Sequence, residues 1–77
     1  MENTKILYED DKVVIKTTGR DYDFIATIEN KTDFAMIVIA DGSSAIRVDA
    51  NGWIGILADE EGRHFMEQVR GDNITVE

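Results

Sequence analysis

The residues that could perform nucleophilic chemistry in this chain are Ser43, Ser44 and the single histidine, His64. A serine nucleophile needs a base within hydrogen-bond reach and is typically presented on a strained strand-to-helix turn. Ser43 and Ser44 instead follow Asp41 in an expected turn, and His64 lies much further along the chain. The sequence therefore gives no support to a catalytic triad, and we expect no catalytic residues.

The sequence also lacks the residue patterns that are typical of metal-binding sites. The chain contains no cysteine and no second histidine to complete a zinc site. The segment 49–52 resembles the start of a calcium loop, but Trp53 and Ile54 stand where such a loop needs an oxygen ligand and a glycine. Paired carboxylates are uninformative, because 16 Asp and Glu in 77 residues must place some of them close together. We therefore expect a protein that is not an enzyme and binds no cofactor or metal.

The charge balance points to the kind of partner. Eight Lys and Arg against those 16 acids give a net charge of -8. Direct binding of DNA or RNA requires a basic groove that neutralises phosphates, and here the basic residues are scattered among twice as many acids. The chain is also 43% hydrophobic, too apolar for a disordered acidic tail. These values predict a folded protein that does not bind nucleic acid itself.

The length of the chain suggests how many domains it forms, and its lack of cysteine and of a signal-peptide pattern suggests its cellular compartment. A chain this short has one core, so residues 1–77 are expected to form a single domain. No signal-peptide pattern opens the sequence, and its longest apolar run, 34–40, is far shorter than the roughly 20 residues of a bilayer span. With cysteine absent, we expect a cytoplasmic protein that does not associate with membranes.

Over most of the chain, apolar and polar residues alternate with the two-residue period of β-strands. Segments 5–8 and 13–16 read as a hairpin around an acidic turn, and 22–29 alternates cleanly, with Tyr22, Phe24, Ala26 and Ile28 on one face. Residues 34–40 are apolar on both faces, as in a central strand. Asp41-Gly42 and Asn51-Gly52 favour two-residue hairpin turns on either side of a strand at 45–49.

The last third predicts a strand and then a helix. In segment 53–57, either Gly55 marks a bulge or a close backbone approach, which puts Trp53 and Leu57 on opposite phases, or Trp53, Gly55 and Leu57 share a face. The sequence leaves both open. Asp59 is a typical N-cap, and an apolar stripe of Gly62, Phe65, Met66 and Val69 predicts a helix that ends near Arg70. Residues 74–76 are either a short strand or a frayed tail.

These elements predict an α+β fold: an antiparallel β-sheet of five or six strands in meander order, with one C-terminal helix packed on it. Sheet edges in so small a protein are also exposed, so a homodimer formed through a strand is a further expectation. The expected core consists of Phe24, Ile28, Phe34, Met36, Val38, Ile46, Val48, Ile56, Phe65, Met66 and Val69.

Nearly every expected turn carries a carboxylate, so the ends of the sheet should generate a negative field that steers the protein toward a basic surface. Tyr22 and Trp53 are the candidate aromatic anchors for such a contact. Asp10, Asp11, Glu60 and Glu61 are expected to be exposed. The expected partner-binding residues are Glu9, Asp10, Asp11, Asp21, Tyr22, Asp23, Trp53, Asp59, Glu60 and Glu61.

In size, acidity and lack of catalytic motifs, the chain resembles the small phage-encoded inhibitors of bacterial defence, of the anti-CRISPR and anti-restriction types. The resemblance implies an inhibitor that binds a basic protein surface of a nucleic-acid-binding complex. Two other functions remain open at this point: a small-ligand binding module, and an accessory subunit of a larger complex.

Overall fold

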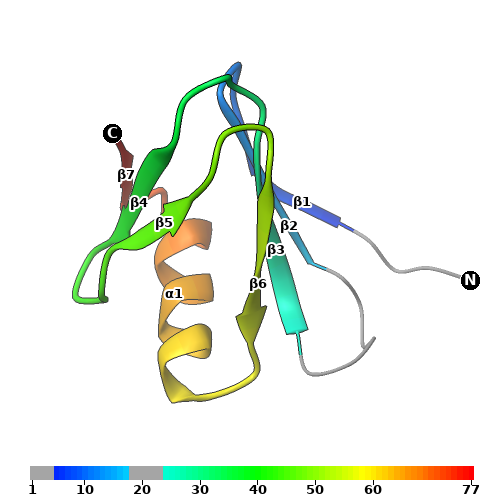
Figure 1. The fold of residues 1–77 in the computed structure, drawn as a ribbon. Coiled ribbons are helices and arrows are strands. Elements are labelled where there is room, and N and C mark those ends of the chain that lie inside the picture. Colours follow the sequence, from blue (N-terminus) through cyan, green and yellow to red (C-terminus); the bar gives the residue numbers. More distant parts are fainter. Residues whose placement is uncertain (1–4, 18–23) are drawn as a thin grey trace, which may run out of the picture.

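The structure, a computed structural model, describes residues 5–17 and 24–77. Seven strands and one helix make up this part of the chain (Figure 1). In chain order they are β1 (Lys5–Glu9), β2 (Val13–Thr17), β3 (Phe24–Asn30), β4 (Met36–Ala40), β5 (Ile46–Val48), β6 (Trp53–Leu57), α1 (Glu60–Arg70) and β7 (Ile74–Val76).

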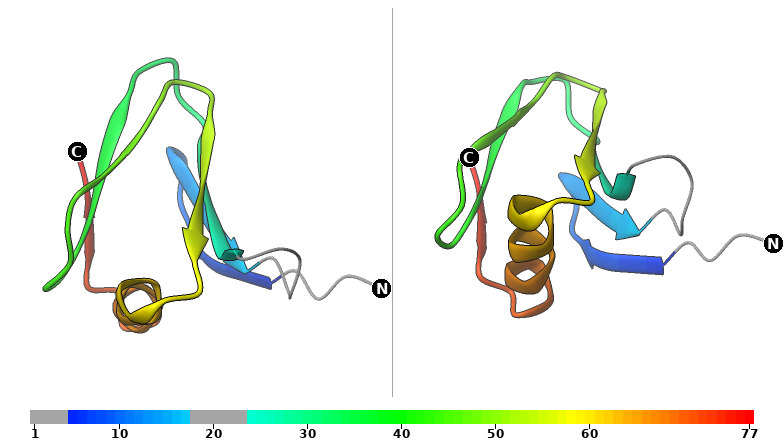
Figure 2. Two further views of the ribbon diagram at one scale, coloured as in Figure 1. Left: turned by 60° about the horizontal axis from the view of Figure 1, so that its bottom comes forward. Right: turned by 90° about the horizontal axis from the view of Figure 1, so that it is seen from below.

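The strands form two antiparallel sheets. One has four strands in the order β1-β2-β3-β6, and the other has three in the order β5-β4-β7. The α+β class, the antiparallel pairing and the C-terminal helix are confirmed, whereas the single meander sheet of five or six strands is wrong. The chain passes between the sheets directly after β3 and after β5, and a third time through α1. The direct connections join the sheets along one side, and α1 fills the space between them on the other (Figure 2).

The two glycine turns have the expected local chemistry but not the expected role. Asn51 adopts a φ of 56°, and Gly52 donates to the main-chain oxygen of Asp49 over 2.9 Å. The turn nevertheless leads from one sheet to the other, because β5 pairs with β4 while β6 pairs with β3. Gly42, with a φ of 79°, does lie in the β4–β5 hairpin, but within a longer loop between the paired residues Val38 and Ile46.

Asn30 holds the two direct crossovers together from inside. It is 3% exposed, and the two hydrogens of its side-chain amide are shared among the carbonyl oxygens of Phe34 (2.7 Å), Val48 (3.2 Å) and Asp49 (3.1 Å). Its side-chain oxygen accepts from the main-chain N–H and the hydroxyl of Thr32. A backbone bond from Asn51 to the oxygen of Thr32 joins the two segments again. This network fixes the angle at which the sheets diverge.

The helix begins as the sequence predicts. The Asp59 side chain caps it by accepting from the Gly62 N–H over 2.7 Å, and Gly62, Phe65, Met66 and Val69 form its buried stripe. Gly62 is required by a close approach, because a Cβ there would lie 1.9 Å from the oxygen of Leu57. The first turn of α1 is therefore in direct contact with the end of β6.

The core lies between the two sheets and α1. It contains most of the expected side chains and also Val13, Ile15, Ala26 and Ala40, which the expectation omitted. Phe34 is wrong as a core residue, since it lies outside the strand in the β3–β4 crossover and is 78% exposed. Ile46 is only half-buried.

Phe24 is also wrong as a core residue, because the strict two-residue alternation expected for 22–29 does not hold at this end of β3. The register between β3 and β6 shifts between Phe24 and Ala26, so that Ile25 is the extra residue of a bulge. One additional residue moves Phe24 to the face opposite Ala26 and Ile28, outside the core. Tyr22, expected on the same face, lies outside the described residues.

Candidate protein-interaction surface

Three of the expected partner-binding residues lie in the β1–β2 turn. Glu9 and Asp11 are exposed, and Glu9 approaches the exposed Lys31 to 3.7 Å. A backbone bond from Lys31 to the oxygen of Lys12 sets this turn beside the β3–β4 crossover. The turn and the two crossovers, residues 9–12, 31–35 and 49–52, therefore form one surface, which we name the crossover end.

Asp10 has a structural role in this turn. One carboxylate oxygen accepts from the main-chain N–H groups of Lys12 (2.8 Å) and Val13 (2.9 Å), and the other accepts from the Tyr8 hydroxyl (2.9 Å). Desolvation opposes ionisation of Asp10, but these hydrogen bonds outweigh it and lower its pKa below the ordinary value. The same bond to Asp10, together with burial, raises the pKa of Tyr8. Asp10 is therefore not a freely exposed carboxylate, contrary to expectation.

Asp59, Glu60 and Glu61 lie at the opposite end of the molecule, where α1 begins (Figure 1). All three are exposed, and Asp59 is committed to the helix cap. The structure thus divides the described acidic residues of the expected site between two ends of the molecule. Asp21, Tyr22 and Asp23 belong to the part of the chain that the structure does not describe.

Trp53 lies on the outer face of the four-stranded sheet and is 62% exposed. Its indole meets the ring of Phe24 edge-on, with centroids 6.2 Å apart and an interplanar angle of 81°. The Phe24 ring lies over Gly55, where a Cβ would come within 2.6 Å of it. Of the two registers that the sequence allows, the one in which Trp53, Gly55 and Leu57 share a face is therefore correct. The bulge is in β3 instead, and the group that lies close to Gly55 is the Phe24 side chain rather than a backbone.

Phe34 is exposed on the crossover end, although the sequence pattern predicts a core residue. Its main chain is held in the crossover end, because its carbonyl accepts from the Asn30 amide (2.7 Å) and its N–H donates to the Thr32 hydroxyl (3.2 Å). Its side chain, by contrast, projects from this fixed backbone between Asp33 and Ala35, both exposed. The sequence signal was the Asn-Lys-Thr-Asp turn before it, which ends one strand and delays the next until Met36.

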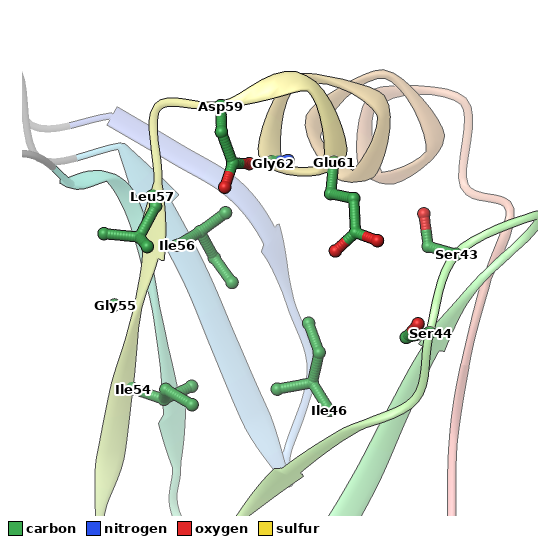
Figure 3. Close-up of a pocket in the computed structure, with 10 residues that line it drawn as sticks. All are labelled: Ser43, Ser44, Ile46, Ile54, Gly55, Ile56, Leu57, Asp59, Glu61 and Gly62. Carbon is green, nitrogen blue, oxygen red and sulfur yellow. Dashed lines mark hydrogen bonds between the residues drawn. The ribbon is translucent and has the colours of Figure 1, made fainter.

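A groove of about 210 Å³ separates β5 from β6 (Figure 3). Ile46 of β5 faces Ile54 and Ile56 of β6 across it, and Asp59 and Glu61 lie at its helix end. Apolar walls with acidic residues at one end suit an apolar segment that carries a positive charge.

The side chains considered for catalysis have other roles. His64 contacts the main-chain oxygen of Asp41 over 2.8 Å through Nε2, which must be the protonated nitrogen because a carbonyl can only accept. This bond fastens α1 to the β4–β5 loop and removes Nε2 as a base for Ser43. The Ser43 hydroxyl is buried without a hydrogen-bond partner. In the described part of the chain, no three His, Cys, Asp or Glu side chains cluster in a way that could hold a metal ion.

The chain matches no protein-family model, none of the curated proteins and no solved structure. Within residues 5–17 and 24–77, no helix has the length and apolar character needed to cross a membrane.

Proposed function

We propose that this protein is a non-enzymatic cytoplasmic inhibitor that occupies a basic surface of a nucleic-acid-processing or bacterial defence complex. Its carboxylates steer it to that surface, and its exposed aromatic side chains anchor it there. Bound in this way, it excludes the nucleic acid that the surface would otherwise hold.

The observation that carries the proposal is the crossover end, where the exposed Phe34 projects from a backbone fixed by buried Asn30. An aromatic side chain on a rigid backbone loses little conformational entropy on binding, which is typical of interface hot spots. Its surroundings are acidic, with Asp11 and Asp33 exposed nearby in the same surface.

The described charges support electrostatic steering. Ion pairs in residues 5–17 and 24–77 join only Lys16 to Glu29, Lys31 to Glu9 and Arg47 to Asp49. Most carboxylates in this part of the chain are thus left to act at long range. Such a field accelerates association with a basic partner and weakens as salt shortens the Debye length to about 8 Å at physiological ionic strength.

The test is a competition experiment. The tagged protein is used to capture its partner from a bacterial lysate, and the purified partner is then titrated with labelled DNA or RNA in the presence of this protein. We expect displacement of the nucleic acid, and an association rate that falls at least about tenfold between 0.01 M and 0.15 M salt. Binding without displacement, or a rate independent of salt, would contradict the proposal.

Charge reversal identifies the end that makes the contact. Asp11→Lys tests the crossover end, and Glu60→Lys with Glu61→Lys tests the helix start, all at exposed positions. The matched control for the double variant is Glu67→Lys with Asp72→Lys, which changes the net charge equally near the far end of α1. We expect association to slow more in the double variant than in its control if the helix start makes the contact, and to slow in Asp11→Lys by more than its smaller charge change accounts for if the crossover end does. Effects that follow only the change in net charge, about half as large for Asp11→Lys as for either double variant, would mean that only total charge matters.

A further inference from the structure

We infer that the free edge of β6 accepts an extended, basic segment of the partner protein as an added antiparallel strand. The inference rests on the proposed function and specifies how the partner is held. In strand addition, the main-chain hydrogen bonds provide affinity, and pockets for alternate side chains provide specificity.

The register shows which main-chain groups of β6 are free. Ile28 pairs with Ile54 and Glu29 with Trp53, and next in register the Asn30 N–H donates to the oxygen of Gly52 over 2.9 Å. Hydrogen-bonded and non-hydrogen-bonded pairs alternate in an antiparallel ladder, so Ile54 is turned toward β3. The N–H and C=O groups of Trp53 and Gly55 consequently point away from β3, to the open edge.

The other described sheet edges are less suited to pairing. β5 has three residues, with the exposed Arg47 in the middle, and β7 also has only three. β1 is interrupted by a register shift between Ile6 and Tyr8. Short strands, charges and bulges are the devices that protect edges. β6, with the sequence WIGIL, is five residues long and uncharged, and the bulge in its pairing with β3 lies in β3, at Ile25, not in β6 itself.

Both faces of an added strand would find apolar surface. Side chains alternate along a strand, so one set would enter the groove between Ile46 and Ile54. The other set would extend the outer face, next to Trp53 and Leu57, which are 62% and 50% exposed. Because β6 borders both the groove and this outer patch, one segment can bury both.

The charge at the end of the groove selects a basic segment. β6 runs from the crossover end toward Asp59, so an antiparallel segment would begin beside Asp59 and Glu61. Basic residues are therefore expected at the amino-terminal end of the segment. The same carboxylates disfavour a second copy of this chain, because its net charge of -8 would be brought against an acidic site.

The probe is the labelled peptide Lys-Lys-Val-Thr-Val-Thr, with both termini blocked, and the composition control is the reversed peptide Thr-Val-Thr-Val-Lys-Lys. We expect the first to bind the wild-type protein, by fluorescence anisotropy, at least about tenfold more tightly than the second. Amide hydrogen exchange at Trp53 and Gly55 should slow on binding, because their N–H groups would enter a ladder. Equal binding of the two peptides, or unchanged exchange at both amides, overturns the inference.

The matched variants are Trp53→Pro and Trp53→Thr, which both remove the indole. Proline also removes the outward N–H, and the first residue of an edge strand tolerates it. Circular dichroism checks that both fold. We expect Trp53→Pro to bind the peptide about tenfold more weakly than Trp53→Thr, the equivalent of one lost hydrogen bond. If Trp53→Pro fails to fold, the exchange experiment on the wild-type protein decides.

The outcomes separate this inference from the proposed function. If salt slows association with the partner while both Trp53 variants bind equally, steering stands and strand addition is overturned. If Trp53→Pro alone loses binding and salt has no effect, strand addition stands and electrostatic steering fails. Sedimentation that shows a wild-type dimer and a Trp53→Pro monomer would assign the edge to a second copy, and would also overturn the inference.

Discussion

The side-chain amide of Asn30 donates to the main-chain oxygen of Val48 over 3.2 Å and so joins the end of one sheet to the end of the other. Residues 18 positions apart are fixed by a single buried polar group. A buried amide without partners is destabilising, so this residue only fits where every one of its hydrogen-bonding groups is satisfied. The bonds to Phe34, Asp49 and Thr32 meet that condition.

Asn30→Asp should destabilise the protein by about 2–4 kcal/mol. The change replaces an amide donor with a carboxylate that faces the carbonyl oxygens of Phe34 and Val48. Urea denaturation measures the loss. The matched control is Asn73→Asp, the same chemical change at an exposed side chain whose partner, the side-chain amide of Gln68, can turn to donate instead, and we expect it to alter stability by less than about 1 kcal/mol. Equal losses would mean that the network does not hold the crossovers.

Gly62→Ala should destabilise the protein although alanine favours helices by about 1 kcal/mol over glycine. The added Cβ would lie 1.9 Å from the carbonyl oxygen of Leu57, so the first turn of α1 must move away from β6. We expect a net loss of about 1–3 kcal/mol by thermal denaturation. Arg63→Ala, the next and exposed helix position, should change stability by less than about 0.5 kcal/mol.

The local elements follow from the sequence, but their assembly does not. The cap at Asp59, the stripe through Phe65 and the positive φ at Asn51 are set by neighbouring residues, and all are confirmed. Which strand pairs with which depends on contacts between distant segments. Asn30 shows the difficulty: in the sequence it is only an asparagine near a turn, and its partners at Val48 and Asp49 become visible in the fold.

In the candidate site too, local features are predictable from the sequence, whereas contacts between distant segments are not. The sequence suggests Trp53 as an aromatic anchor without fixing which face it occupies, and it places the ring partner Phe24 in the core, because a bulge at Ile25 has no clear signature in the sequence. Asp10 was expected to be free, and the hairpin bonds that hold it depend on the geometry of the turn. The free edge of β6 could not be identified until the sheet order was known.

Gly55→Ala should destabilise the protein because its Cβ would lie 2.6 Å from the ring of Phe24. We expect about 1–3 kcal/mol. The double variant Phe24→Ala with Gly55→Ala removes the clash, so its loss should be smaller than the sum of the two single losses by at least about 0.5 kcal/mol. A double-mutant cycle by urea denaturation measures this coupling, and strict additivity would contradict the packing of Phe24 on Gly55.

The bonds to Asp10 should give stability an acid-dependent component. Because the pKa of Asp10 is lowered in the folded state, its contribution is complete above the unfolded value of about 3.9 and is lost as the pH falls through the folded pKa. Asp10→Asn keeps an acceptor oxygen but cannot titrate, so its urea midpoint should fall less steeply on acidification. Tyr8→Phe, which removes one donor to Asp10, should give an intermediate slope. Identical slopes in all three proteins would assign the acid dependence elsewhere.

The exposed position of Phe34 gives a direct comparison with a core phenylalanine. Phe34→Ala removes a ring that is 78% exposed, and we expect stability to change by less than about 0.5 kcal/mol. Phe65→Ala removes a ring that is 2% exposed and packed between α1 and the sheets, so it should cost about 3–5 kcal/mol.

If Phe34 is an interface anchor, its variant should be as stable as the wild type yet bind the captured partner at least about tenfold more weakly. A stable Phe34→Ala variant with unchanged affinity would remove Phe34 from the proposed contact.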